Sequence, residues 1–305
     1  MSAARPDPVP APGAPRKRPF LRGCLVLTGV ILGFFFLLGL LARMDGVSMP
    51  GGGGKVAVVP VTGIITESEG TIELLKKYGK DADVRAVVLR IDTPGGGVGP
   101  SQEIHEEVGK LREKKPVVVS MGALAASGGY YIASAAGKIY ANPGTITGSI
   151  GVIMPFVNMR GLAEKIGIRG MEVKSGPFKD AGSSLRDMNP AERALLQAVV
   201  DNTHMQFVHA VAKGRKLAVA KVLAVADGRI LSGEQALALG LVDALGNQED
   251  AVAEAGRLGG IRGEPEVVTP QKKKISLVEL LKQEVRTLVD ERLSTGPGAI
   301  EYAIH

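Results

Sequence analysis

One serine stands among small residues in a segment that could carry a nucleophile. The segment AASGG at 125–129 follows an apolar run, so Ser127 should lie where a strand gives way to a helix. Small neighbours let a substrate backbone approach the hydroxyl, and the backbone N–H of Gly128 could donate to an oxyanion during acyl transfer. The structural alternative is a helix N-cap, a position where serine is common.

A glycine loop upstream offers further backbone N–H groups. The loop DTPGGGVGP at 92–100 follows an apolar run that predicts a strand at 86–91. Its spacing gives neither G-x-x-x-x-G-K-[ST] nor G-x-G-x-x-G, so the two common nucleotide signatures fail. Amides at such a turn can also stabilise an oxyanion, and Gly96 is the candidate donor. A plain tight turn is the alternative.

A serine nucleophile needs a base, and lysine is the candidate. The four histidines all lie outside the stretch 127–180 that holds the unusual residues: His105, His204, His209 and His305. The segment GMEVKSGPFKD at 170–180 predicts a short strand and then a glycine-proline loop carrying Lys179. A lysine acts as a base only if desolvation lowers its pKa from about 10.4 towards about 7–8. Most lysines are instead solvated surface charges.

Alternating strands and helices must position these residues. Apolar runs predict strands at 56–61, 86–91 and 117–120, and helical patterns occupy 71–78 and 102–112. This alternation is typical of an α/β fold with a parallel sheet, whose strands are buried on both faces. Further helices are expected at 191–213 and after a capping box formed by Ser232 and Gln235. Function should gather at the strand ends.

Five motifs together resemble the signal peptide peptidase A family of serine–lysine proteases. They are D-x-P-G-G-G at 92–97, A-A-S-G-G-Y-Y at 125–131, T-G-S-I-G-V at 147–152, K-S-G-x-x-K-D at 174–180 and D-G-R-x-x-x-G-x-x-A at 227–236. The resemblance covers roughly residues 55–254. It implies the crotonase and Clp protease-like fold, a spiral of βαβ units around parallel sheets.

The resemblance also implies a role for each matching residue. Ser127 would be the nucleophile, Lys179 the general base, and Ser149 the hydroxyl that orients the lysine ammonium. The N–H groups of Gly96 and Gly128 would form the oxyanion hole. No metal ion or organic cofactor is implied.

Substrate and assembly follow from the same resemblance. Family members with one catalytic unit, like this chain, look like ring-forming homo-oligomers in which a neighbour helps to assemble each groove. Their substrates are remnant signal peptides, which suit an apolar cleft. Lys174, the other lysine of its motif, is interpreted as structural.

The segment 23–42 predicts a membrane anchor. Its twenty residues carry no charge, and at about 1.5 Å per residue they span a hydrocarbon core of about 30 Å. Basic residues at 16–22 outnumber Arg43, so the N-terminus should remain cytoplasmic. A cleavable signal peptide is the alternative, but this apolar run is longer than the apolar region of a signal peptide, which usually has about 7–15 residues. We expect a single-pass protein of a bacterial inner membrane with its catalytic domain outside the cytoplasm.

Composition completes the expected organisation. Most of the formal charge of +6 lies in residues 1–22, and aromatics make up 4% of the chain, so nothing predicts a nucleic-acid surface. The single cysteine, Cys24, says nothing of redox compartment. The expected parts are a disordered basic tail at 1–22, the membrane helix at 23–42, a glycine-rich linker at 43–54, the peptidase domain at 55–270 and an amphipathic helix and tail at 271–305.

Three other interpretations fit parts of the sequence. An enzyme of the same fold could act on acyl thioesters, with the glycine loops as its oxyanion hole. A hydrolase could use Ser127 in a variant nucleophile elbow with His204 or His209 as the base. A catalytically inactive membrane scaffold could retain the motifs without the chemistry.

Overall fold

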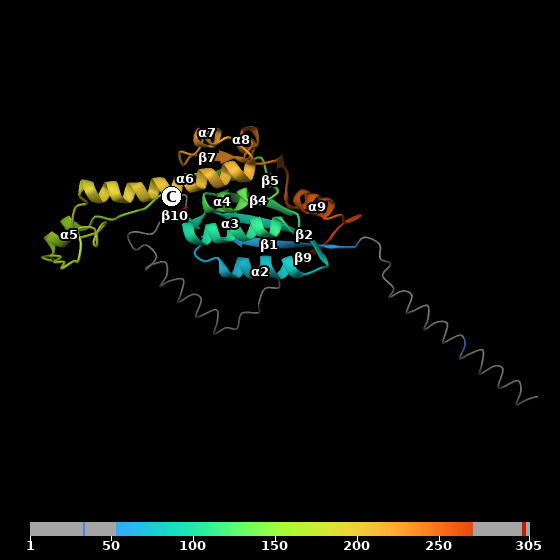
Figure 1. The fold of residues 1–305 in the computed structure, drawn as a ribbon, viewed down its shortest axis with the longest axis horizontal. Helices are drawn as coiled ribbons and strands as arrows, with labels where there is room; N and C mark the ends of the chain where they lie inside the picture. Colours follow the sequence, from blue (N-terminus) through green and yellow to red (C-terminus); the bar gives the residue numbers. More distant parts are fainter. Residues whose placement is uncertain (1–32, 34–52, 271–300, 303–305) are drawn as a thin grey trace, which may run out of the picture. The chain divides into compact units, whose positions relative to one another are not determined.

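A computed structural model describes residues 33, 53–270 and 301–302 (Figure 1). The predicted tail at 1–22 lies outside these residues, as do the predicted membrane helix at 23–42 apart from residue 33, most of the linker at 43–54, and most of the tail at 271–305. Among the described residues, no helix has both the length and the apolar character needed to cross a bilayer.

The centre of the fold is a mostly parallel sheet. Its strands are β1 (Lys55–Thr62), β2 (Val84–Thr93), β4 (Val117–Ala126), β5 (Lys138–Ala141), β6 (Ile146–Gly148), β7 (Ile230–Ser232), β8 (Ala244–Leu245) and β9 (Glu266–Val268). The order is β7-β6-β4-β2-β1-β9, and β5 pairs with both β4 and β8. Only the pair β6–β7 in this sheet is antiparallel. The predicted α/β fold with a parallel sheet is confirmed.

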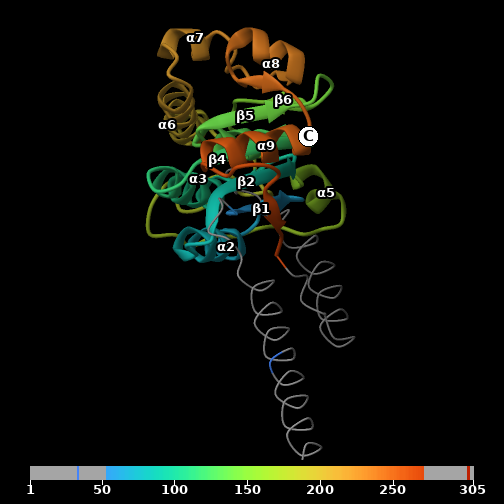
Figure 2. The ribbon, with the colours of Figure 1, turned by 90° about the vertical axis from the view of Figure 1, so that its right-hand side faces the viewer.

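Helices cover both faces of the sheet (Figure 2). The helices of the described chain are α2 (Glu69–Lys80), α3 (Val98–Arg112), α4 (Gly128–Ser134), α5 (Arg160–Lys165), α6 (Pro190–Arg215), α7 (Val219–Leu223), α8 (Gly233–Leu239) and α9 (Gln248–Leu258), of which α5 and the first half of α6 lie away from the sheet. Leu89 and Val119 point into the larger core, and Val88 and Val118 into a smaller core under Ala255 of α9. Successive strand residues face opposite sides, so both faces are buried and the strands are apolar throughout.

Capping residues fix where two helices begin. The predicted capping box of Ser232 and Gln235 is present at the start of α8. A second box joins Asn189 to Glu192, with Pro190 at the first position of α6. Helix α6 therefore begins one residue before the predicted position.

The register of the strands brings three of the sequence motifs to one edge of the sheet. Strand β4 runs beyond the predicted 117–120 to Ala126, through small residues. Thr93 at the end of β2 pairs with Ala125, and Ala126 pairs with Gly148 at the end of β6. The residues after 93, 126 and 148 thus gather at the carboxyl ends of parallel strands, where sites form in open α/β sheets.

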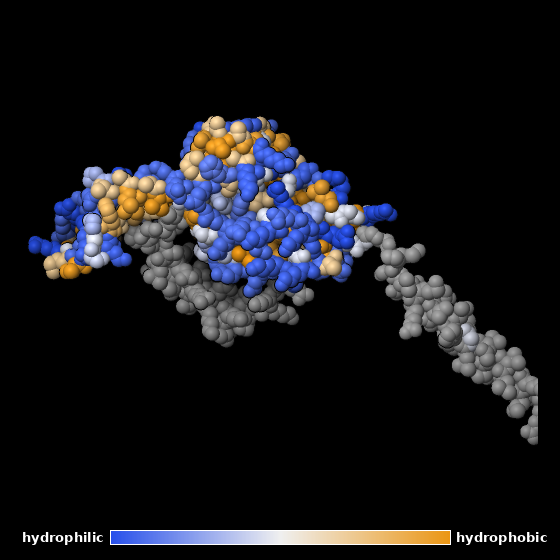
Figure 3. Space-filling view, viewed as in Figure 1, coloured by the Kyte–Doolittle hydropathy of each residue, from blue (hydrophilic) through white to orange (hydrophobic). Residues whose placement is uncertain are grey.

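Residues 153–199 leave the sheet and form a projection that we call the arm. It contains α5 and the first half of α6, at the left of Figure 1. The strand predicted at the start of 170–180 is wrong, because the segment has no strand partner and Val173 is fully exposed. Most of the exposed large hydrophobic side chains of the described residues belong to the arm, where Figure 3 shows apolar surface.

A short strand pair lies beside the glycine loop. Strand β3 (Gly96–Gly97) pairs antiparallel with β10 (Glu301–Tyr302), near the C-terminus of the chain. Gly96 is also bridged in parallel to Ile65. The glycine loop is thus flanked by extended chain.

Candidate active site

Ser127 lies between β4 and α4 in an unusual backbone conformation. Its φ is 52° and its ψ is −118°, a region that costs a residue with a Cβ about 1–3 kcal/mol. The side chain is 1% exposed, and its Oγ has no hydrogen-bond partner among the described residues. Ser127 occupies the N-cap position of α4, but its side chain makes no capping hydrogen bond to the helix. The backbone holds this hydroxyl in place and leaves it unpaired.

Ser149 lies beside Ser127. The Ser127 N–H donates to the carbonyl of Gly148 at 2.9 Å, and the Ser149 N–H donates to the carbonyl of Arg229 at 2.8 Å. Ser149 also has a positive φ, 49°, and is 7% exposed. Positive φ is uncommon outside glycine, and two of the three such residues described are these two serines.

The glycine loop is held against Ile65 at the same edge. The Gly97 N–H donates to the Ile65 carbonyl at 2.8 Å, and the Gly95 N–H donates to Thr93 Oγ1 at 3.0 Å. Gly96 has φ 153°, and a Cβ there would lie 2.3 Å from the Ile65 carbonyl oxygen, so only glycine fits. The two predicted oxyanion donors lie at the ends of two paired strands. Gly128 follows Ser127 at the end of β4, and the loop with Gly96 follows β2, whose Thr93 pairs with Ala125 of β4.

Close packing fixes the start of α4. A Cβ on Gly129 would lie 2.6 Å from Thr93 Cγ2, so the helix approaches β2 as closely as glycine allows. One residue further, the fully buried Tyr130 hydroxyl donates to the Leu241 carbonyl at 2.8 Å, and burial raises the pKa of Tyr130. These contacts hold the backbone that carries Ser127.

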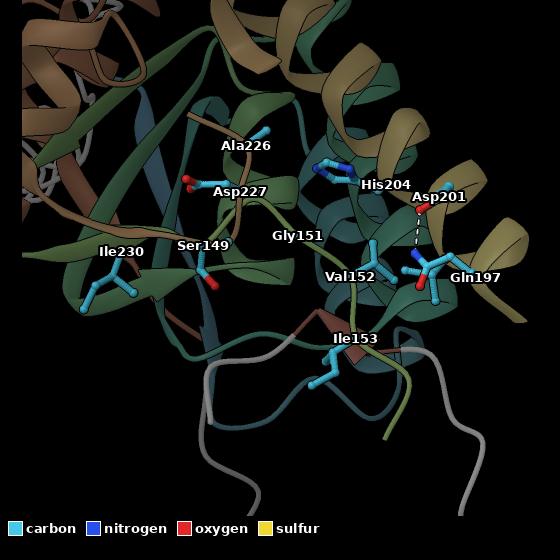
Figure 4. Close-up of a pocket in the computed structure, with 12 residues that line it drawn as sticks. Ser149, Gly151, Val152, Ile153, Gln197, Asp201, His204, Ala226, Asp227 and Ile230 are labelled. Atoms are coloured by element: carbon cyan, nitrogen blue, oxygen red, sulfur yellow. Dashed lines mark hydrogen bonds between the residues drawn. The ribbon is translucent and has the colours of Figure 1, made fainter. Parts of the chain in front are cut away.

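A pocket of about 600 Å³ opens beside Ser149 (Figure 4). His204 extends into it from α6, and on the same helix Gln197 donates to Asp201 at 2.7 Å. Its lining mixes polar and apolar residues, namely Ser149, Gly151, Val152, Ile153, Gln197, Val200, Asp201, His204, Ala226, Asp227, Gly228 and Ile230. Within the described residues, no three His, Cys, Asp or Glu side chains could share a metal ion.

No described histidine is hydrogen-bonded to Ser127, since its Oγ has no partner. His204 Nε2 is buried without a partner, and His209 is exposed on α6. His105 packs against the ring of Tyr131 at 4.7 Å, and burial, aided by Lys213, lowers its pKa to about 4. A Ser–His pair is therefore not formed within the described chain.

Lys179 lies on an exposed turn of the arm. Its backbone N–H donates to the Gly176 carbonyl at 3.3 Å, while its side chain has no hydrogen bond or ion pair with the described residues. Because Ser127 Oγ is also unpartnered, one chain does not join the predicted dyad by a hydrogen bond. Lys174, the other lysine of the motif, forms an ion pair with Asp180.

Two features of the site were missed from the sequence. The positive φ of Ser127 and Ser149 could not be predicted from residue type, because glycine is the usual residue at positive φ and neither position holds one. Asp180, Arg186 and Glu192 form a chain of ion pairs in the arm. The motif of Asn189, Pro190 and Glu192 signals a helix start and could have identified the last of these residues.

Fold and site together define a class: an α/β enzyme that presents a buried, unpaired serine hydroxyl at the carboxyl edge of a parallel sheet. The model of peptidase family S49 matches residues 109–262. This chain belongs to that family and is a serine peptidase.

Relatives of known name agree with this assignment. A putative protease of Synechocystis sp. is 46% identical over 246 residues, covering 79% of this chain and 86% of that protein. A putative signal peptide peptidase SppA of Enterococcus faecium is 37% identical over 212 residues, covering 65% of this chain and 62% of that protein. The predicted resemblance to the signal peptide peptidase A family is confirmed. Among solved structures, a mutant of the 1510-N membrane-bound stomatin-specific protease has a TM-score of 0.47 at 18% identity, covering 72% of this chain and 99% of that one.

Proposed function

We propose that this chain is a membrane-anchored serine endopeptidase in which Ser127 is the nucleophile and Lys179 the general base. The observation that carries the proposal is the Ser127 hydroxyl, which is buried, unpaired and held at positive φ beside Ser149. Strained backbone of this kind clusters at functional sites. Ser149 would orient the lysine ammonium from the neighbouring strand end.

The proposed chemistry needs no group beyond these side chains and two amides. Ser127 Oγ attacks the scissile carbonyl while the Lys179 amine takes its proton. The N–H groups of Gly96 and Gly128 stabilise the oxyanion, a contribution of about 10²–10³ in rate per donor in comparable sites. The ammonium then protonates the leaving amine, and water hydrolyses the acyl-enzyme.

Lys179 would come from a second copy of the chain in a homo-oligomeric ring. It lies exposed on the arm and has no partner in the described part of its own chain. The same arm exposes Val157, Leu162 and Phe178, and contiguous exposed apolar side chains mark interaction surfaces. A neighbour that covers the arm would bury these side chains and the amine together.

Labelling by a serine-directed acylating probe tests the assignment of roles. Ser127→Ala and Lys179→Ala should each abolish labelling and peptidase activity, whereas Lys174→Ala, the matched control from the same motif, should keep most of both. Thermal unfolding of all three checks that they fold. Full labelling of Lys179→Ala, or loss confined to Lys174→Ala, would refute the proposal.

Mixing two inactive variants tests whether the dyad is shared between copies. In a random 1:1 assembly of Ser127→Ala with Lys179→Ala, about one site in four receives both intact residues if they come from different copies. Activity should therefore return to about a quarter of the native value. No recovery from subunits shown to have exchanged would place both residues within one chain.

Apolar peptides, including remnant signal peptides, are the proposed substrates. The pocket beside Ser149 has apolar lining from Val152, Ile153 and Ile230. The edge of β3 already accepts an extended strand, and peptides commonly bind by adding a strand to such an edge. The name of the Enterococcus relative supports the same substrate class. Release of fragments from synthetic signal peptides, compared with polar peptides of equal length, tests it.

The anchor at 23–42 and the location of the enzyme outside the cytoplasm of a bacterial cell belong to the same proposal. Their support is the run of twenty uncharged residues and the basic residues before it. The full chain should stay in membranes washed with alkaline carbonate, and a chain starting at residue 53 should not. Extraction of both would refute the anchor.

A further inference from the structure

A chain of ion pairs joins the turn that carries Lys179 to the start of α6. Asp180, the next residue, accepts a hydrogen bond from Arg186 Nε at 2.8 Å, and its own backbone carbonyl accepts one from Arg186 Nη2 at 3.0 Å. The same guanidinium donates from Nη1 to Glu192 Oε2 at 2.8 Å and also contacts Oε1 of that carboxylate. Arg186 therefore clamps two elements with one planar group.

Glu192 is the fixed end of this clamp. Its side chain is fully buried, and it closes the capping box by accepting from the Asn189 N–H at 3.1 Å. Hydrogen bonds from Arg186 lower the pKa of Glu192 and hold the pKa of Asp180 well below its usual range. Lys174 contributes a second cation to Asp180. Asp180, Arg186 and Glu192 are thus charged at neutral pH.

The clamp of Asp180, Arg186 and Glu192 lies in a part of the arm that has almost no buried apolar side chains. In the arm, Ala163 is the only buried hydrophobic side chain among the described residues, and the large apolar residues face outward. A buried ion pair adds little stability relative to apolar packing, yet removal of one partner leaves an unpaired buried charge. Such a network therefore fixes a conformation more than it stabilises the fold.

Helix α6 connects Glu192, at its start, to the helix that follows Ser127. Its second half is buried through Phe207 and Val211, and a Cβ on Gly214 would lie 2.0 Å from the Ser134 carbonyl oxygen of α4. Helix α4 begins immediately after Ser127. One continuous rigid path thus runs from the Lys179 turn through Arg186 and α6 to the serine loop.

We propose that Arg186 is a positioning residue of the peptidase: it clamps Asp180 to Glu192 and so fixes Lys179 relative to α6. This inference rests on the proposed role of Lys179 as the base. In an assembly of identical copies, a fixed offset between Ser127 and Lys179 lets every amine meet a neighbouring hydroxyl in the same geometry.

Arg186→Met is the test variant, and Arg160→Met is its matched control. Arg160 is also an arm arginine with two ion pairs, but its partners Glu164 and Asp187 are exposed. Misplacing a catalytic group by about 1 Å can cost about 100-fold, so kcat/KM of Arg186→Met should fall by about that factor, while Arg160→Met stays within about twofold. Millimolar methylguanidine should restore part of the activity of Arg186→Ala.

Subunit mixing separates positioning from a general structural defect. Arg186→Met mixed with Ser127→Ala should regain activity, because the second chain supplies the correctly held lysine and the first an intact serine. Arg186→Met mixed with Lys179→Ala should remain near its own low value. Equal recovery in both mixtures, or activity of Arg186→Met within twofold of native, would overturn the inference.

The two proposals fail in different ways. Activity of Lys179→Ala would refute the role of that lysine, whatever Arg186→Met does. An inactive Lys179→Ala together with an active Arg186→Met would refute the clamp alone. If the activity of Arg186→Met falls only in proportion to a lowered Tm, and Arg186→Ala does not respond to methylguanidine, the role of Arg186 is purely structural and the clamp is also refuted.

Discussion

The sheet core and the arm are built on opposite principles. The strands of the core place buried aliphatic side chains alternately on their two faces. Backbone hydrogen bonds and closely packed glycines hold the two serines in place. The arm exposes its apolar side chains and buries a glutamate clamped by an arginine. Apolar packing stabilises without direction, whereas hydrogen-bonded charges define one geometry. The core therefore supplies stability, and in our proposal the arm supplies a positioned surface for a second copy of the chain.

The sharpest test of this contrast uses two positions on α6. Phe207→Ala empties a fully buried site in the core half and should cost about 3–5 kcal/mol. Leu195→Ala changes a side chain that is 42% exposed in the arm half and should cost less than about 0.5 kcal/mol. Urea unfolding of dilute, separated subunits measures both. Similar costs would mean that the arm half is also packed within one subunit.

Two glycines give the next comparison. In Gly129→Ala the new methyl meets Thr93 Cγ2 at 2.6 Å, so overpacking should cost about 1–3 kcal/mol and reduce probe labelling of Ser127. Gly176→Ala in the arm meets nothing within 4 Å and should leave both unchanged. Unfolding curves and labelling rates check the pair. A normal labelling rate in Gly129→Ala would show that the close approach of α4 to β2 is not needed.

Acid should affect the core before the arm. His105 has a pKa of about 4 when folded and about 6.5 when unfolded, so the unfolded state binds more protons between these values. Stability should fall as the pH drops from 6.5 to 4, by on the order of 1 kcal/mol after allowance for partial exposure. His105→Gln should remove this slope.

The carboxylates of the arm lose their stabilising contribution in the same direction, but at lower pH. Arg186, and then Lys174, lower the pKa of Asp180, so its contribution is present above the unfolded pKa and is lost only as the pH falls below about 3.8. Urea unfolding at a series of pH values separates the two windows. A slope between pH 6.5 and 4 that survives in His105→Gln would assign the acid sensitivity to another group.

The smallest expected effect on stability comes from the most exposed side chain of the arm. Val173→Ser should change the unfolding free energy of a subunit by less than about 0.5 kcal/mol, yet weaken self-association. Ile64→Ser, at an exposed site outside the arm, should affect neither. Sedimentation velocity over a range of concentrations measures the association. Unchanged assembly in Val173→Ser would remove this side chain from the contact surface.

The same contrast explains how much could be predicted from the sequence. Strands β1, β2 and β4 were predicted because burial on both faces makes each an apolar run, and α8 because its caps are local. The strand predicted near Val173 failed because an alternating pattern predicts a strand only where one face is buried, and this segment is exposed on both faces and pairs with no described strand. Local sequence patterns predict secondary structure correctly where the apolar side chains are buried within the chain itself.

Features that depend on distant residues escaped prediction. Arg186 and Glu192 are separated from Lys179 by loops, so their link to it exists only in three dimensions. The pairing of Ala126 with Gly148 sets Ser127 beside Ser149, and neither motif alone carries that information. Whether Lys179 reaches Ser127, and whether the fold is the Clp-like spiral, stay predictions.

The edge of β3 that pairs with β10 can accept only one partner at a time. Glu301–Tyr302 occupies it, so a peptide adding there must first displace the chain's own end. A competitor that belongs to the same chain acts at an effective concentration of up to about millimolar, which does not depend on the amount of protein. Dilution therefore does not relieve this competition, and only ligands that bind the edge well, or are themselves held locally in a membrane plane, will outcompete it.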